Sequence, residues 1–411
     1  MLLKESDRRR KLTEAILFRD FQVTVQLPEN RLCPPVPNRL NYILWLEDIL
    51  EATAIAVGTQ RFITGIDIGT GASAIYPLLG CRSNENWRFV ATELDAISFK
   101  YAESNIKTNA LQDRISILKA EPSGPLLLPL SYSDMSPGGY DFTMCNPPFY
   151  ESRDEILRSA EGKEVGPNAV CTGADVEMIT DGGEAAFVSR MVLESIQSGT
   201  RCKWYTSMLG KRSSLTQIVK SLNEHNIDNY AITEFIQGQT RRWAIAWSFT
   251  NIRLPEAISR ISNPSLQNIL PTRNTLQRSF NFSGPPPMLG DVLHRMFNAV
   301  EGVSSQFITP PARDESTIID SIVFAQGNTW SRAARRKKRT QNENVDTDML
   351  VESEQPKLIC RLRWRHEPGV ERKTVRQVAL LVVDWVRGDD RGLFESFTNH
   401  IWRKVEVDLA P

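Results

Sequence analysis

The sequence predicts an α/β fold built on a mostly parallel sheet of seven strands. Between residues 62 and 249, short apolar segments of strand length alternate with segments whose apolar residues recur at helical spacing. Such alternation is typical of a mostly parallel sheet with helices on both faces. The predicted strands are residues 62–68, 87–92, 115–118, 140–145, 203–208, 229–235 and 244–249, and helices are expected at 96–109 and 183–197.

Composition changes along the chain predict four parts. Residues 1–60 are expected to form a helical, basic N-terminal module, and residues 61–252 contain the predicted sheet. Residues 253–287 are rich in Pro, Asn, Ser and Arg, which favours a linker. Residues 288–411 are expected to form a small α+β domain with a disordered polar insert at 340–355. In that domain we expect helices at 290–300 and 388–404, strands at 317–324 and 356–364, and a strand or short helix at 375–385.

Overall composition is that of a globular protein. With 411 residues, 41% hydrophobic and 24% charged, the chain has room for two or three domains. It has no apolar stretch near the roughly 18–20 residues of a membrane span and no signal-peptide core, so we expect neither membrane insertion nor secretion. The six cysteines are scattered without a CxxC pair, and there are only four histidines. We therefore expect reduced thiols, no metal site, and a cytosolic or nuclear protein.

Positive charge is locally concentrated, although the formal net charge is zero. Closely spaced cations displace the counterions of a nucleic acid, so these clusters are candidate RNA-binding residues, with ordinary surface charge as the alternative. The run 329–339 is also typical of a nuclear localisation signal. The candidates are Arg8, Arg9, Arg10 and Lys11, then Lys211, Arg212, Arg241 and Arg242 beside predicted strands, and finally Arg335, Arg336, Lys337 and Lys338.

A glycine-rich loop follows the first predicted strand. Residues 65–73 read GIDIGTGAS, in which Gly69 and Gly71 let the backbone pass close to a ligand. The loop resembles an adenosylmethionine-binding loop rather than a P-loop, because it lacks the Gly-Lys-Ser/Thr that holds phosphates. Asp67 would orient the loop or meet an ammonium group, and Glu93, 26 residues further on, would accept the ribose hydroxyls of a nucleoside cofactor. The alternatives are a structural turn and an NAD site, although Ala74 replaces the third glycine of GxGxxG.

The tetrad Asn146, Pro147, Pro148 and Phe149 follows the predicted strand 140–145. Two prolines end a strand, because neither can donate an N–H to the ladder, so an amide and an aromatic ring are presented at the carboxyl edge of the sheet. The Asn146 side chain and the Pro147 carbonyl can accept both N–H groups of a planar amine, and Phe149 can stack on its ring. The alternative is a strand-ending turn with a core phenylalanine.

These residues and their flanks resemble the methyltransferase-like protein 16 family of U6 small nuclear RNA adenosine-N6 methyltransferases, related to bacterial RlmF. The resemblance covers about residues 20–249. It implies a Rossmann-like class I methyltransferase fold in which Asn146 to Phe149 hold the adenine. A family loop that regulates cofactor access falls near residues 119–125, and Gln239 replaces a usual RNA-contacting arginine. The matching motifs are VPNRLNY (36–42), GIDIGTGAS (65–73), YPLLG (76–80), CNPPF (145–149), WY (204–205), MLGK (208–211), TEFIQG (233–238) and RWAIAW (242–247). The expected contacts to S-adenosylmethionine are Arg39, Asp67, Gly69, Thr70, Gly71, Ser73, Glu93 and Asn146.

The resemblance implies an S-adenosylmethionine-dependent enzyme that methylates N6 of an adenosine in the ACAGA-type sequence of U6 RNA, with a role in pre-mRNA splicing. We expect a nuclear monomer, with a cytoplasmic fraction left open, and an auxiliary RNA-binding role for residues 288–411 through the motif at Trp330. A protein glutamine N5-methyltransferase is one alternative, which a protein-substrate assay would reveal. A non-catalytic RNA-binding protein is the other, which equal activity of Asn146→Ala and wild type would favour.

Overall fold

The computed structural model describes residues 5–60, 62–132, 138–161, 174–238, 240–282, 288–309, 319–331, 334, 336, 355–367 and 377–408. The chain forms two compact units. The first comprises residues 1–50, 59–250 and 258–271, and the second comprises residues 51–58, 251–257 and 272–411. Each unit has a sheet and a hydrophobic core of its own.

The first unit contains a seven-stranded sheet in the order β3-β2-β1-β4-β5-β7-β6. Strands β1 to β5 pair in parallel, and β7 runs antiparallel between β5 and β6. All seven predicted strands are present, so the predicted fold class is confirmed. Their bounds are β1 Ile63–Ile68, β2 Trp87–Glu93, β3 Ile115–Lys119, β4 Tyr140–Cys145, β5 Cys202–Leu209, β6 Tyr230–Gln237 and β7 Thr240–Trp247.

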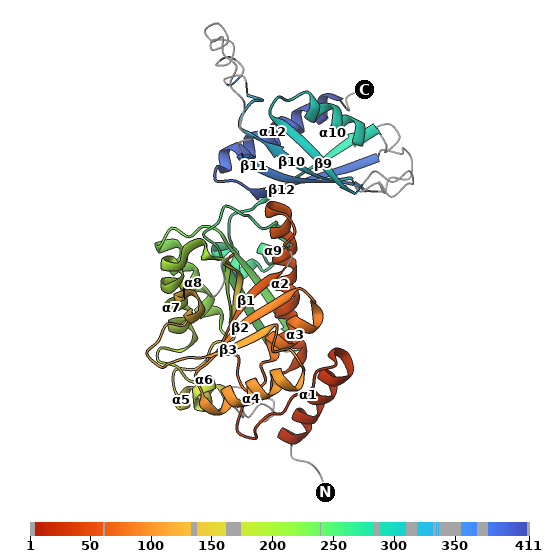
Figure 1. Cartoon of the computed structure of the whole chain (residues 1–411). Coiled ribbons are helices and arrows are strands. Elements are labelled where there is room, and N and C mark those ends of the chain that lie inside the picture. Colours follow the sequence, from red (N-terminus) through yellow and green to blue (C-terminus); the bar gives the residue numbers. More distant parts are fainter. Residues whose placement is uncertain are drawn as a thin grey trace, which may run out of the picture. The chain divides into compact units, whose positions relative to one another are not determined.

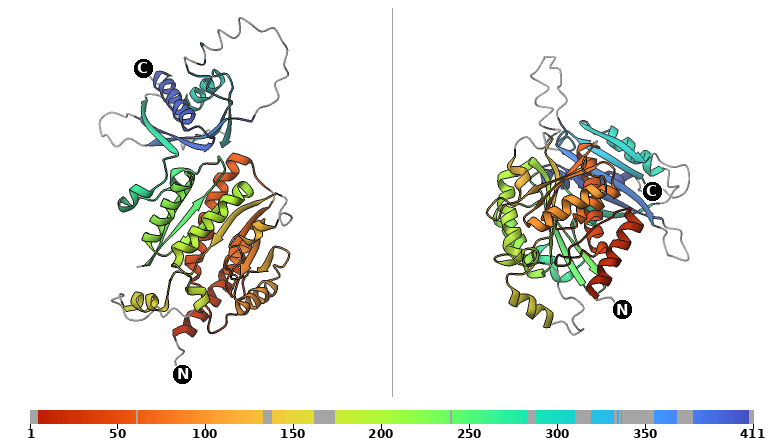
Figure 2. Two further views of the ribbon diagram at one scale, coloured as in Figure 1. Left: turned by 90° about the vertical axis from the view of Figure 1, so that its left-hand side faces the viewer. Right: turned by 60° about the horizontal axis from the view of Figure 1, so that its bottom comes forward.

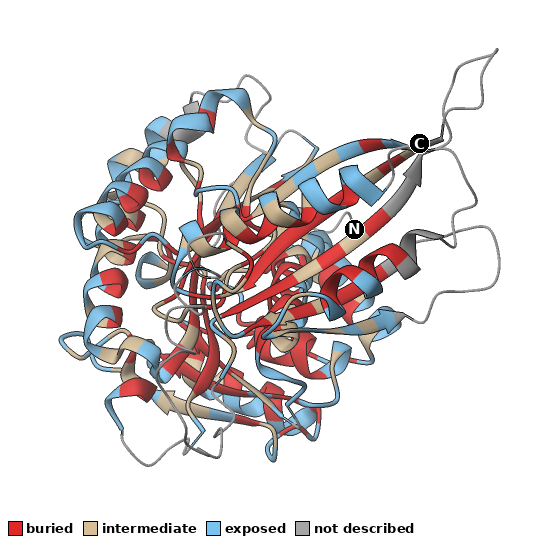
Figure 3. Cartoon of the chain, turned by 90° about the horizontal axis from the view of Figure 1, so that it is seen from above, coloured by how far each residue is buried: buried red, intermediate tan, exposed pale blue. Residues whose placement is uncertain are grey.

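Helices cover both faces of this sheet. Helices α7 and α8 pack on one face, and α2 and α3 lie on the other (Figure 1). The strands are mostly buried, whereas the outer faces of the helices are exposed (Figure 3). The helices of this part of the chain are α1 Glu5–Phe21, α2 Val36–Val57, α3 Ile75–Ser83, α4 Ala96–Thr108, α5 Arg153–Glu161, α6 Asp175–Met178, α7 Gly183–Ser198, α8 Arg212–Glu224 and α9 Glu256–Ser259, with 3-10 turns at Leu128–Ser131, Gly199–Arg201 and Pro264–Ile269.

The second unit is a five-stranded antiparallel sheet in the order β8-β12-β11-β10-β9. Helices α10 and α12 lie together on one face of it (Figure 2), and their apolar residues join the strands in one core. Trp330 is part of this core and packs against Phe397, with 4.9 Å between the ring centroids. The elements are β8 Thr275–Phe282, α10 Met288–Asn298, β9 Val303–Thr309, β10 Ile319–Ala325, β11 Leu358–Glu367, β12 Gln377–Arg387 and α12 Arg391–Asp408.

The structure differs from the sequence-based expectation at two strands of the second unit. Strand β8 lies within the stretch 253–287 that composition marks as a linker, and β9 was not expected at all. Both are edge strands with few buried residues, so their mixed polar composition resembles that of a loop. Residues 340–354 of the expected disordered insert lie outside the described residues. Within the described ranges, no helix is both long and apolar enough to cross a membrane.

Candidate functional site

Strand register brings the two predicted motifs to the same edge of the sheet. Ile68, the last residue of β1, pairs with Thr92 of β2 on one side and with Cys145 of β4 on the other. The residues that follow these strands therefore meet, and they line a cavity of about 270 Å³ at the carboxyl edge. Of the predicted cofactor and tetrad residues, Arg39, Gly69, Thr70, Gly71, Ser73, Glu93, Asn146, Pro147 and Pro148 line this cavity, whereas Asp67 and Phe149 lie outside its lining.

The glycine loop turns sharply after β1. Gly69 and Gly71 have φ angles of 70° and 66°, in the left-handed region that a side chain disfavours. The Gly71 N–H donates to Glu93 Oε2 at 2.8 Å, and the Asp95 N–H donates to Glu93 Oε1 at 2.7 Å. Two backbone donors thus hold the Glu93 carboxylate at the cavity wall, while burial raises its pKa.

Two oppositely charged residues are buried beside this loop. Asp67 is fully buried, and burial raises its pKa to about 7. Arg39 is 7% exposed, and its Nη1 donates to the Tyr76 hydroxyl at 2.8 Å. Burying such groups is costly unless a partner compensates them.

Several buried polar atoms around the cavity have no hydrogen-bond partner among the described residues. Two of them are Arg39 Nε and Asn146 Oδ1, and beside them the Asp67 carboxylate and the Thr70 hydroxyl have no partner except each other. Native structures rarely leave such groups unsatisfied, so their concentration here indicates a place for a polar ligand. The set combines a cationic donor with anionic and neutral acceptors, so a ligand with both a carboxylate and an ammonium group would fit it.

The tetrad is held in place by the polypeptide on either side of it. The Phe149 ring lies against Gly210, where an added Cβ would stand 2.8 Å from Cδ1 of the ring. The Arg242 guanidinium lies over the same ring at 5.4 Å from its centroid. Tyr150, the next residue, forms two backbone hydrogen bonds, from its N–H to the Met178 carbonyl and from the Thr180 N–H to its own carbonyl, both of 3.0 Å.

The predicted RNA-binding cations fall into three groups. Arg8, Arg9, Arg10 and Lys11 lie on α1, and none of them lines the cavity. Near the tetrad, Lys211 pairs with Glu155 and lies over the Tyr150 ring, Arg241 pairs with Glu234 at 3.2 Å, and Arg212 donates to the Ser265 carbonyl. Arg336 is exposed, whereas Arg335, Lys337 and Lys338 lie outside the described residues, as does Gln239.

Sequence reasoning missed the residues that support the site through distant contacts. Glu184, at the start of α7, is 1% exposed and accepts the Gly210 and Lys211 N–H groups at 2.6 and 2.8 Å. Glu177, on α6, lines the cavity and accepts the Leu32 N–H. The partners of Glu184 lie 26 and 27 residues away, and Leu32 lies 145 residues from Glu177, so no local sequence pattern marks either glutamate.

Two known proteins are similar to this chain in sequence. The U6 small nuclear RNA (adenine-(43)-N(6))-methyltransferase of Schizosaccharomyces pombe is 35% identical over 399 residues, covering 96% of this chain and 92% of that protein. The RNA N(6)-adenosine-methyltransferase METTL16 of Mus musculus is 42% identical over 248 residues, covering 60% of this chain and 44% of that protein. The chain thus spans less than half the length of the mouse protein.

A solved structure and a family profile extend the comparison. The human METTL16 catalytic domain in complex with MAT2A 3′UTR hairpin 1 is 40% identical with a TM-score of 0.56, covering 63% of this chain and 85% of that one. A profile of the family described as RNA methyltransferase matches residues 3–251, which is more than half of the chain. The chain therefore belongs to the RNA methyltransferase family.

Proposed function

We propose that this protein transfers the methyl group of S-adenosylmethionine to N6 of an adenosine in U6 small nuclear RNA. The observation that carries the proposal is the pairing of β1 with β4, which places the glycine loop and Asn146, Pro147 and Pro148 of the tetrad on one cavity. A methyl donor and an amine bound there would lie side by side. Similarity to the Schizosaccharomyces pombe U6 enzyme over 96% of the chain supports the choice of RNA and of the base.

The unsatisfied atoms of the cavity suit the polar groups of this cofactor. Arg39 would hold its carboxylate, Asp67 would face its ammonium group, and Glu93 would accept the ribose hydroxyls. Gly69, Thr70, Gly71 and Ser73 would bring the backbone close to it. When bound, the cofactor supplies a methyl group on a positively charged sulfur.

The tetrad would hold the target amine. An exocyclic amine of adenine is a weak nucleophile, because its lone pair is delocalised into the ring. Asn146 Oδ1, which is buried without a partner, and the Pro147 carbonyl would each accept one N–H of the amine. Both acceptors favour a pyramidal nitrogen with its lone pair toward the methyl group. Methyl transfer would form an N–C bond in place of the S–C bond of the donor, and the extra proton on nitrogen would leave to solvent.

The base would leave its stack to reach this site, and Phe149 would stack on it, a contact worth about 1–3 kcal/mol. The cations on α1 and beside the tetrad would contact the RNA backbone, and residues 288–411 would act as an auxiliary RNA-binding domain. Because U6 RNA functions in pre-mRNA splicing, we infer a nuclear location. The basic run 329–339 suits a nuclear localisation signal.

The test is methyl transfer from labelled S-adenosylmethionine to a panel of short RNAs built around UACAGAGAA. We expect N6-methyladenosine at one position of that sequence in wild type, and a loss of at least about 100-fold in Asn146→Ala, because the amine loses one of two acceptors that position it. Binding of S-adenosylhomocysteine to Asn146→Ala, followed by calorimetry, shows whether the cofactor site is intact. Absence of N6-methyladenosine at every site with wild-type protein would refute the proposal.

A further inference from the structure

Residues 174–180 form a wall of the cavity that neither predicted motif includes. The segment contains α6, and Val176, Glu177, Ile179 and Thr180 line the same cavity as the glycine loop and the tetrad residues. It comes from a part of the chain well beyond the tetrad in sequence. Its position therefore depends on contacts with other segments.

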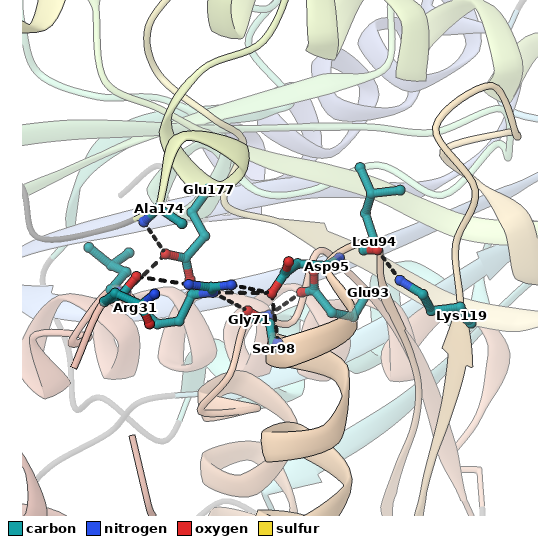
Figure 4. A network of polar contacts seen from close by, with 11 residues as sticks. Arg31, Gly71, Glu93, Leu94, Asp95, Ser98, Lys119, Ala174 and Glu177 are labelled. Carbon is teal, nitrogen blue, oxygen red and sulfur yellow. Dashed lines mark hydrogen bonds and ion pairs between the residues drawn. The ribbon is translucent and has the colours of Figure 1, made fainter. Parts of the chain in front are cut away.

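On the cofactor side, one glutamate fastens this segment. Glu177 Oε2 accepts the Ala174 N–H at 2.9 Å (Figure 4). It also accepts the Leu32 N–H at 3.0 Å, and Leu32 lines the cavity. A carboxylate that accepts two backbone N–H groups makes stronger bonds than a neutral acceptor. The Glu177 carboxylate thus links residues 174–180 to the loop segment around Leu32.

The same stretch continues to the predicted ribose site. Arg31 is 5% exposed, and its Nη2 and Nε donate to Asp95 Oδ2 at 2.8 and 3.1 Å (Figure 4). The Asp95 N–H in turn donates to Glu93 Oε1 at 2.7 Å. An unbroken series of hydrogen bonds and one peptide link therefore joins Glu177 to Glu93.

On the other side, the segment is fastened to the tetrad. Met178 and Thr180 each form a backbone hydrogen bond of 3.0 Å with Tyr150, which directly follows Phe149. Tyr150 and Ile179 also form a parallel β-bridge. A displacement of residues 174–180 would therefore move the peptide next to Phe149.

We propose that Glu177 is a positioning residue that couples cofactor binding to binding of the target adenosine. The inference rests on the proposed function, because it takes Glu93 and Phe149 as the two ligand-binding ends. A ligand that fills the cavity holds residues 174–180 against Leu32, and the Tyr150 hydrogen bonds then fix the tetrad for the base. Each ligand lowers the ordering cost for the other, which gives positive coupling.

The test measures the dissociation constant of an RNA containing UACAGAGAA with and without saturating S-adenosylhomocysteine. We expect the product to tighten RNA binding to wild type by about 5-fold or more, the lower end of usual coupling. In Glu177→Ala the ratio should fall close to 1. Glu177→Gln should keep most of the coupling, because its amide oxygen can still accept both N–H groups.

Asp141 provides a matched control. This buried carboxylate also accepts a backbone N–H, from Thr64 at 2.7 Å, and it pairs with Lys203 at 2.7 Å. It lies near the start of β4, about 17 Å along the strand from Asn146 at roughly 3.3 Å per residue. Asp141→Ala should lower the melting temperature as Glu177→Ala does, yet leave the coupling ratio unchanged.

The outcomes separate this inference from the proposed function. Wild type that methylates the RNA but shows no coupling overturns the inference alone. The inference alone is also overturned if Glu177→Ala shows the same coupling as wild type. The same holds if Asp141→Ala loses as much coupling as Glu177→Ala. If the RNA does not bind, either with or without S-adenosylhomocysteine, the inference and the proposed function are both overturned. The RNA and S-adenosylhomocysteine do not react with each other. The ratio of the two dissociation constants therefore reports binding and is independent of the methyl transfer rate.

Discussion

Gly210→Ala should impair the enzyme by moving one aromatic ring. Gly210 directly follows β5, and its φ is outside the left-handed region, so the backbone itself accepts alanine. The new Cβ would stand 2.8 Å from Cδ1 and 3.2 Å from Cε1 of Phe149, and 3.1 Å from Glu184 Oε2. Ordinary carbon contacts are about 3.5–4.0 Å, so the ring must shift by roughly 0.7–1.2 Å. Because Phe149 is only partly buried, it can move without unfolding the unit.

The size of the effect follows from that shift. A misplacement of about 1 Å at a reacting group can cost up to about 100-fold in rate. Loss of base stacking would remove roughly 1–3 kcal/mol, which is about 5- to 150-fold in RNA binding. We therefore expect kcat/KM for RNA to fall by about 10- to 100-fold. The affinity for S-adenosylhomocysteine should be unchanged, because Gly210 does not line the cavity.

Steady-state methyl transfer with varied RNA and saturating S-adenosylmethionine measures this effect. Gly138→Ala is the control, because a Cβ at Gly138 meets no atom within 4 Å and its φ is not in the left-handed region. The decisive comparison is a double-mutant cycle with Phe149→Ala, which removes the ring that the new Cβ would strike. Gly210→Ala should cost much less in that background, because only the 3.1 Å contact with Glu184 Oε2 remains. Fully additive losses would refute the steric explanation.

Three further outcomes are expected. Burial raises the pKa of Asp67 from 3.8 to about 7 in the folded protein. The cofactor-free protein should therefore lose stability relative to Asp67→Asn as pH rises from about 4 through 7. Melting temperatures of the two proteins that change in parallel with pH would contradict this. Gly65→Ala should destabilise the first unit by about 1–3 kcal/mol in urea unfolding, because its Cβ would overlap the Phe142 ring on paired strand β4, and Phe142→Leu should recover part of the loss. Arg242→Ala should lower kcat/KM for RNA more than Arg241→Ala does, because Arg242 supports Phe149 whereas Arg241 is paired with Glu234, and equal effects would indicate that both act only as surface charge.

The parts of the fold that the sequence predicted are those with local signals. Buried parallel strands such as Tyr140–Cys145 are short, mostly apolar runs, and the two prolines that follow this strand mark its boundary. The ambiguous stretch 375–385 proved to be strand β12, which lies inside its sheet and is apolar along most of its length. Strands β8 and β9 are at the edges of the same sheet, and their mixture of polar and apolar residues does not distinguish a strand from a loop.

The candidate site also contains some residues that local sequence signals predict and others that they do not. Gly69 and Asn146 directly follow β1 and β4, and Glu93 is the last residue of β2. Parallel pairing alone brings these three residues to one edge, so the sequence was sufficient to group them. Glu177 and Glu184 act on backbone N–H groups far away in sequence. Any glutamate can accept such bonds, so residue type and spacing give no signal for them. Arg31 is similar, because its partner Asp95 lies 64 residues away.

The unsatisfied polar atoms around the cavity favour a ligand-binding role for the motif residues over a purely structural role. A turn that served only the fold would gain little from a fully buried Asp67, because the Thr70 hydroxyl and the Arg39 charge offset only part of the cost of burying its carboxylate. Its raised pKa is the measure of that cost. A cationic ligand group would favour the ionised form and recover part of it. Cofactor affinity should therefore increase as pH rises toward 7, and this increase should be absent in Asp67→Asn, which separates a binding role from a structural one.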